Sequence, residues 1–301
     1  MKKLLALVLA GFMVLSFTAC VKKENCILLY ENPGNDMEAS VTFDLDGNGE
    51  DEIKVSLTED YYITVSSSDA EIKLGYGDAY YIDKIYGIDI DEKDGKKELV
   101  IITEELSSDL YMRVLRLDKG KFNLINFEYS ALSENLQEYE YASLGYDTDI
   151  EVDGNVIKTS ARGRCGMWSV ESEYSYNDGV FSYIMMQERD VVLPSYEWRM
   201  GVAISDPDYA MELGLAKDEN ELNLLKEGYV IAYADFVNNG KTPEREGMIK
   251  LLSGDIFKIT KEDADGFVFI EKKDGESGWI YMGDFSDNRY EVSEMAFFLA
   301  D

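Results

Sequence analysis

Residues 41–57 read VTFDLDGNGEDEIKVSL, and this stretch indicates the fold of the N-terminal half of the chain. Ile53, Val55 and Leu57 alternate with polar residues, which is typical of a β-strand buried on one face. Before this strand, carboxylates and amides occupy every second position, with glycines between them. Such a loop either folds around a hard cation or is an acidic hairpin turn without an ion.

The same period-two alternation continues to Ile184. It recurs in three further runs: Tyr61, Ile63 and Val65; Ile72, Leu74 and Tyr76; and Tyr111, Arg113, Leu115 and Leu117. Turn signals such as Asn177-Asp178-Gly179 separate the runs, and the pattern predicts an antiparallel β domain of hairpins. Leu99–Ile102 is continuously apolar, so we expect this strand to be buried on both faces. A short helix is plausible in this domain only over Ser133–Leu144.

The N-terminus, MKKLLALVLAGFMVLSFTAC, has the layout of a secretory signal. Its apolar run is too short to span a membrane. Phe17-Thr18-Ala19-Cys20 resembles a bacterial lipobox, which implies a lipoprotein signal peptide over 1–19, a lipidated Cys20 and a tether over 20–37. We therefore expect a protein attached by lipid to the extracytoplasmic face of the cell membrane. The alternative is an ordinary signal peptide with an incidental cysteine.

Charge and composition exclude several functions. Without Lys2 and Lys3, 60 acidic residues face 27 Lys and Arg, so nucleic acid is not an expected partner. The chain has no histidine, which excludes Ser-His-Asp and Cys-His catalysis and histidine-ligated zinc. In an exported protein, Cys26 and Cys165 could form a disulfide.

The spacing of the first acidic loop suits calcium, which binds six to eight oxygens. Its candidate ligands are Asp44, Asp46, Asn48, the carbonyl of Glu50, and Glu52. An EF-hand is excluded because Val55 stands where that motif places its last glutamate. The alternative is that the loop only connects two strands.

A second acidic loop begins at Asp89, 45 residues after Asp44, and also precedes an apolar strand. A weaker third copy surrounds Asp149. The loops resemble those of FG-GAP or VCBS-type repeats, which implies propeller-blade-like β repeats over 38–188. Because so few units cannot close a propeller, we expect an incomplete propeller or a sandwich. The resemblance implies calcium ligands at Asp89, Asp91, Asp94 and Glu98, although Lys93 departs from the pattern.

The C-terminal region differs in pattern. A connector over 189–227 ends in a short helix, for which Asp218 offers a cap and Gly228 a stop. The run from Gly254-Asp255 to Gly278-Trp279-Ile280 resembles a bacterial SH3-like domain, which implies a small β-barrel over 228–301. The aromatic residues that could line a binding groove are Tyr233, Phe267, Trp279 and Tyr281. Phe267 and Trp279 could equally fill the barrel core.

These observations favour a non-enzymatic binding or scaffold protein of the bacterial envelope. Its partners would be a cell-wall peptide, a glycan or a surface protein. One alternative is a carbohydrate-active hydrolase that works through paired carboxylates, although no particular pair stands out. A solute-binding protein is the other, but that class needs alternating strands and helices, which the periodicity does not show.

Overall fold

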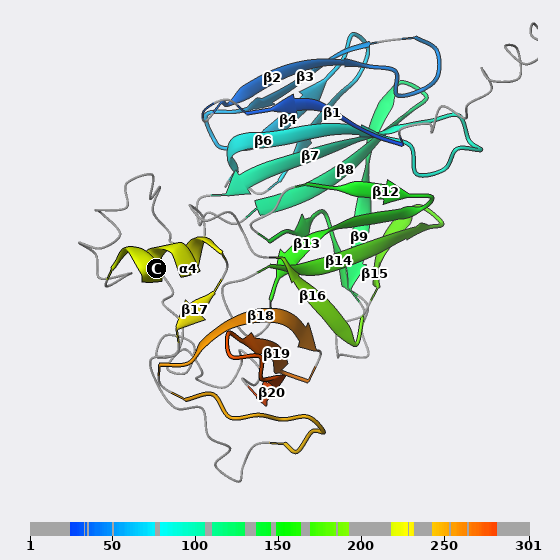
Figure 1. Ribbon diagram of the computed structural model, residues 1–301. Coiled ribbons are helices and arrows are strands. Elements are labelled where there is room, and N and C mark those ends of the chain that lie inside the picture. Colours follow the sequence, from blue (N-terminus) through cyan, green and yellow to red (C-terminus); the bar gives the residue numbers. More distant parts are fainter. Residues whose placement is uncertain are drawn as a thin grey trace, which may run out of the picture.

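The computed structural model describes residues 25–32, 34, 36–49, 51–75, 79–105, 110–129, 137–145, 149–163, 169–184, 186–192, 218–227, 229–231, 243–252, 254–263 and 265–281. Over these residues the protein is mainly β, as the alternation predicts (Figure 1). The helix among them is α4 (Glu219–Lys226), which confirms the predicted helix before Gly228. Within the described ranges, no helix is long and apolar enough to cross a membrane.

The strands of the described residues follow one another in chain order. They are β1 (Cys26–Glu31), β2 (Glu38–Phe43), β3 (Asp51–Leu57), β4 (Ile63–Ser66), β5 (Glu71–Leu74), β6 (Ala79–Ile88), β7 (Glu98–Glu105), β8 (Leu110–Asp118), β9 (Lys121–Tyr129), β10 (Gln137–Tyr139), β11 (Ala142–Ser143), β12 (Glu151–Asp153), β13 (Val156–Arg162), β14 (Ser169–Asn177), β15 (Val180–Ile184), β16 (Glu188–Val192), β17 (Val230–Ile231), β18 (Ile256–Asp263), β19 (Phe267–Lys272) and β20 (Ser277–Tyr281).

Two four-stranded antiparallel meanders form the N-terminal sandwich. Strands β2–β5 make one sheet, and β6–β9 make the other with β1 hydrogen-bonded to the free edge of β6. Alternation decides which side chains meet between the sheets: Val41, Ile53 and Val65 point inward from the first meander, and Ile85 and Leu99 from the second. One acidic loop joins β2 to β3 and the other joins β6 to β7, so both occupy the same place in their meanders.

Strand β7 is buried along its whole length, which confirms the prediction for Leu99–Ile102. Leu99 and Ile101 belong to the sandwich core, whereas Val100 and Ile102 face a second core on the opposite side. That second core is closed by a third meander, β12–β15, whose last strand pairs in parallel with β9. The second meander therefore lies between two others.

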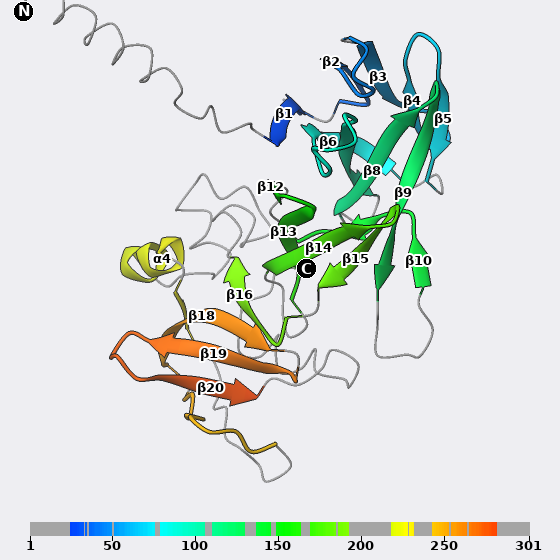
Figure 2. The ribbon, with the colours of Figure 1, turned by 90° about the vertical axis from the view of Figure 1, so that its right-hand side faces the viewer.

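Strand β16 links the third meander to the C-terminal module (Figure 2). Its end pairs with the start of β14, at Ser169 and Val170, and its beginning pairs with Lys261–Asp263 of β18. Val170 also packs into the core of the module, beside Phe257 and Ile270. The module is built on the antiparallel strands β18, β19 and β20, with β17 on β18 and a bridge from Met248 to Trp279.

Three expectations need correction. Residues 20–37 are more than a tether, because β1 lies within them and pairs with β6. A helix over Ser133–Leu144 is wrong for the described part of that range, where β10 and β11 pair with β9 and β8. The connector expected from residue 189 begins inside β16, because both neighbouring sheets supply backbone partners there.

Candidate functional site

The first acidic loop is folded by its own carboxylates. Asp44 Oδ1 accepts hydrogen bonds from the backbone N–H groups of Gly47 at 2.9 Å and Gly49 at 3.3 Å. Asp46 Oδ1 accepts one from the N–H of Asn48 at 3.1 Å. Gly47 has a φ of 79° and Gly49 a φ of 140°, values that a glycine adopts without steric cost. The alternating spacing therefore produces a tight turn in which Asp44 and Asp46 accept the backbone N–H groups.

The other two predicted ligands of this loop contribute less. Glu52 lies on β3, opposite Thr42 of β2, and its side chain is exposed. Glu50 lies outside the described residues. Asn48 is exposed at the tip of the turn. Among the described residues of the first loop, Asp44 and Asp46 are thus the pair that the fold brings inward.

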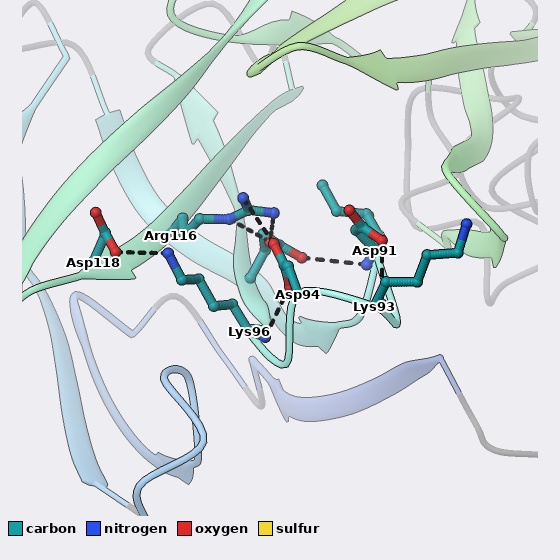
Figure 3. A network of polar contacts seen from close by, with 8 residues as sticks. Asp91, Lys93, Asp94, Lys96, Arg116 and Asp118 are labelled. Carbon is teal, nitrogen blue, oxygen red and sulfur yellow. Dashed lines mark hydrogen bonds and ion pairs between the residues drawn. The ribbon is translucent and has the colours of Figure 1, made fainter.

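The second acidic loop already contains a cation, the guanidinium of Arg116 from β8 (Figure 3). Arg116 Nε donates to Glu98 Oε1 at 2.7 Å, and Arg116 Nη1 lies 3.1 Å from Asp94 Oδ2. Lys96 forms an ion pair with Asp118 at 2.6 Å. Asp91 and Asp94 each accept a backbone N–H, from Lys93 and Lys96. Two carboxylates of this loop, Asp94 and Glu98, are therefore neutralised by a side chain of the protein itself.

Glu98 differs from the other loop carboxylates because it is fully buried. Its Oε2 accepts the backbone N–H of Ile90 at 3.3 Å. Burial raises the pKa of Glu98 to about 7, although Arg116 and the Ile90 N–H both favour the carboxylate. The guanidinium is in turn held charged, since Glu98 raises the pKa of Arg116 against the effect of burial.

The two acidic loops lie against each other. The N–H of Lys97 donates to the carbonyl of Leu45 at 2.9 Å. A Cβ on Gly47 would stand 2.9 Å from the carbonyl oxygen of Gly95, so only glycine fits there. Among the residues that the structure describes, no three Asp, Glu, Cys or His side chains converge closely enough to hold a metal ion. The loops form one acidic end of the molecule in which the carboxylates remain dispersed.

Two of the predicted aromatic residues of the C-terminal module are buried. Phe267 and Trp279 are buried, and Tyr281 is half-buried with its ring 4.9 Å from that of Phe267. Tyr233, the fourth predicted groove residue, lies outside the described residues. Phe267 and Trp279 are thus buried but lie outside the core cluster around Phe257 and Ile270, and Tyr281 is the half-buried residue of the predicted set.

An arginine that the sequence pattern did not single out covers this aromatic group. The guanidinium of Arg245 lies 3.4 Å from the ring centre of Trp279 and 5.2 Å from that of Phe267. It also forms ion pairs with Asp263 of β18 and with Glu188 of β16, the latter at 2.9 Å. A cation thus lies on the aromatic rings of the module, and a carboxylate of the linking strand holds it there.

The sequence pattern indicates one of the buried arginines, Arg113. Arg113 occupies an inward position of the alternating run that includes Leu115 and Leu117, and a cation there requires a buried acid. The structure supplies Glu105, 3.0 Å from Arg113 Nη2, and Thr103 accepts from Nη1 at 2.8 Å. No comparable pattern marks Arg116, Arg189 or Arg245, whose acidic partners lie 18, 73 and 18 residues away along the chain.

Of the two cysteines that could pair, the structure describes Cys26. Cys26 is a free thiol that donates to the carbonyl of Ile150 at 3.7 Å. Burial and the nearby carboxylates of Asp149 and Glu151 raise the pKa of Cys26 to about 11. Cys165 and the lipidation candidate Cys20 both lie outside the described residues.

Comparison with known proteins identifies the C-terminal module. Residues 229–283 match the family model of the variant SH3 domain, which confirms the SH3-like part of the prediction. Searches of curated proteins and of solved structures found no match. The chain therefore combines a variant SH3 domain with an N-terminal β structure of three meanders.

Proposed function

We propose that the protein is a lipid-anchored binding or scaffold protein on the extracytoplasmic face of the bacterial envelope, and that its variant SH3 domain carries the binding surface. The observation that carries this proposal is the family match at residues 229–283. SH3-like modules occur as binding units. The chain has no histidine, so it lacks the general base that common Ser-His and Cys-His hydrolases use.

The anchor rests on the lipobox-like run that ends at Cys20. Its cysteine would carry the lipid, and the two lysines at 22 and 23 would lie next to the headgroups. The acidic surface disfavours direct binding to anionic lipid or nucleic acid, so the acyl group is the attachment that the chain offers.

Within the SH3 domain we assign the ligand surface to the side that carries Tyr281. Its ring packs edge-on against Phe267, and Arg245 lies over the same buried aromatic pair. A half-buried tyrosine that packs against Phe267 offers both an apolar ring and a hydroxyl, the mixture that binding surfaces use. Cell-wall peptides, which combine apolar side chains with carboxylates, fit this mixture.

Binding is tested with the mature, unlipidated protein and purified cell-wall fragments. We expect the wild type to be retained and Tyr281→Ala to be released, with unchanged melting temperature as the check on folding. Tyr80→Ala is the matched control, because Tyr80 is an exposed tyrosine of β6 in the other half of the protein. If neither wall fragments nor surface proteins retain the wild type, or if Tyr80→Ala is released as well, the SH3 assignment is wrong.

We propose calcium as a stabilising ion at the first acidic loop only. Its carboxylates bind backbone N–H groups of their own turn, whereas Arg116 already neutralises Asp94 and Glu98 of the second loop. Asp44 and Asp46 are thus the carboxylates that would hold the ion, with the amide oxygen of Asn48, whereas Glu52 is exposed on β3 and lies apart from them. The FG-GAP or VCBS resemblance supports the same place, between the first two strands of a meander.

Calorimetric titration of calcium-stripped protein tests this site. Extracellular calcium sites bind at about 0.1–1 mM, and saturation a hundredfold above the dissociation constant stabilises by about 2.7 kcal/mol. The melting temperature of the wild type should therefore rise in millimolar calcium, and that of Asp44→Ala much less. Asp91→Ala, in the second loop, should respond like the wild type. No heat and no stabilisation up to about 10 mM calcium would remove the ion from the proposal.

A further inference from the structure

We infer that the acidic-loop end of the molecule faces the bilayer, with Ile27 and Leu28 of β1 in contact with the lipid surface. This inference rests on the lipid anchor proposed above. It adds an orientation to that anchor and a contact surface made by residues of β1.

Two large apolar side chains lie exposed on β1. Ile27 is 42% exposed and Leu28 is 47% exposed, on an edge strand whose other side pairs with β6. Adjacent residues of a strand point to opposite faces, so together they line the free edge rather than one face of the sheet. A bulge separates Leu28 from Tyr30, after which the strand turns its side chains into the sandwich core. The apolar edge is therefore confined to the beginning of β1.

The start of β1 is fixed to the acidic loops. The carbonyl of Asn25 accepts the backbone N–H of Asp89 at 3.0 Å, and Asn25 Nδ2 donates to Glu92 at 2.9 Å. The second loop in turn contacts the first through Lys97 and Leu45. Asn25 is thus a rigid point of the domain, located at the end where both loops lie.

The chain from the anchor to this point is short. Five peptide units separate Cys20 from Asn25, and they span at most about 18 Å even when fully extended. A lipidated Cys20 lies at the bilayer surface, so the distance of Asn25 from that surface cannot exceed about 18 Å. Ile27 and Leu28 follow Asn25 after one residue. Their exposed apolar side chains can contact lipid with little desolvation of polar groups.

The SH3 domain lies at the other end of the molecule. In both views the strands of the third meander lie between β1 and the strands β18, β19 and β20 (Figures 1 and 2). An anchor at the β1 end therefore presents the SH3 domain away from the membrane, toward the cell wall. The acidic loops beside β1 repel anionic headgroups, so the contact is expected to be closest on zwitterionic lipid.

The experiment uses the full lipidated protein in phosphatidylcholine vesicles, with lipids brominated on the acyl chains as quenchers of tryptophan emission. Ile27→Trp places a probe on the apolar edge of β1. Leu252→Trp is the matched control, because Leu252 is 46% exposed in the SH3 domain. The emission of Trp168, Trp198 and Trp279 is measured on the wild type and subtracted.

We expect Ile27→Trp to lose most of its added emission in brominated vesicles, and Leu252→Trp to lose none. Equal responses of the two probes in protein that floats with the vesicles would overturn the orientation while leaving the anchor intact. An Ile27→Trp probe that is shielded from a water-soluble quencher but untouched by brominated lipid would show that protein covers β1, which also overturns it. Failure of the wild type to float would refute the anchor itself.

Discussion

Replacing Arg189 by methionine should destabilise the junction between the third meander and the SH3 domain. Arg189 lies on β16, and its Nη2 is 2.6 Å from Oε1 of Glu262 on β18. Glu262 is fully buried and Arg189 nearly so, while Arg189 Nη1 also donates to the hydroxyl of Tyr183 at 3.2 Å. The substitution keeps the apolar stem and removes the charge, which leaves a carboxylate in the interior without its main partner.

Breaking a buried ion pair by removing one partner costs about 3–5 kcal/mol, and we expect the lower end of that range, about 3 kcal/mol. The reason is that Glu262 has a further interaction besides Arg189. Replacing both residues, Arg189→Met with Glu262→Leu, removes the buried carboxylate as well and should recover most of the loss.

Urea unfolding followed by tryptophan emission and by circular dichroism measures this effect. In the wild type both signals should change together, because β16 pairs with strands of both domains. In Arg189→Met the SH3 domain should unfold at lower urea. A loss below about 1 kcal/mol, the value of an exposed pair, would refute the claim that this ion pair joins the domains. Failure of the double variant to recover stability would refute the electrostatic explanation.

Two further predictions concern the N-terminal sandwich. Because the pKa of Glu98 is raised from 4.5 to about 7, the native state binds more protons than the unfolded state between these values. The free energy of unfolding should therefore fall by about 3 kcal/mol as pH rises through that window, and Glu98→Gln should lack this part of the slope in pH-dependent urea titrations. Gly87→Ala would place a Cβ 2.3–2.6 Å from ring carbons of Phe43, at a cost of about 1–3 kcal/mol, whereas a Cβ on Gly34 would have nothing within 4 Å, so Gly34→Ala should be nearly neutral in the same unfolding assay.

The alternating patterns of the sequence predicted the mainly β fold because, in strands such as β2 and β4, every second side chain points into the core. The continuous run Leu99–Ile102 correctly indicated a strand covered on both faces. The SH3 domain was likewise visible, since its turns and its Gly-Trp-Ile strand follow one another locally. These features depend on residues that are close together in the chain, so they can be recognised in a single sequence.

The contacts that join distant segments were not predictable in the same way. CILLYE, the sequence of β1, follows the leader without a turn signal, and its pairing with β6 depends on residues 50 or more positions away. The role of β16 depends on backbone partners in two different sheets. The acidic loops show the same limit, because their spacing is compatible with a bound cation or with a plain turn and does not reveal that Arg116 pairs with Asp94 and Glu98 in the second loop.

The most direct test of the proposed function is the membrane fractionation of Cys20→Ala against the wild type in the native cell. The proposed anchor, the presentation of the SH3 domain and the contact made by β1 all depend on a lipid at this residue. We predict that the wild type sediments with membranes and carries the mass of an acylated cysteine, and that Cys20→Ala is released in soluble form. A Cys20→Ala protein that still sediments with membranes, or a wild type without acyl mass, would contradict the lipid-anchored function.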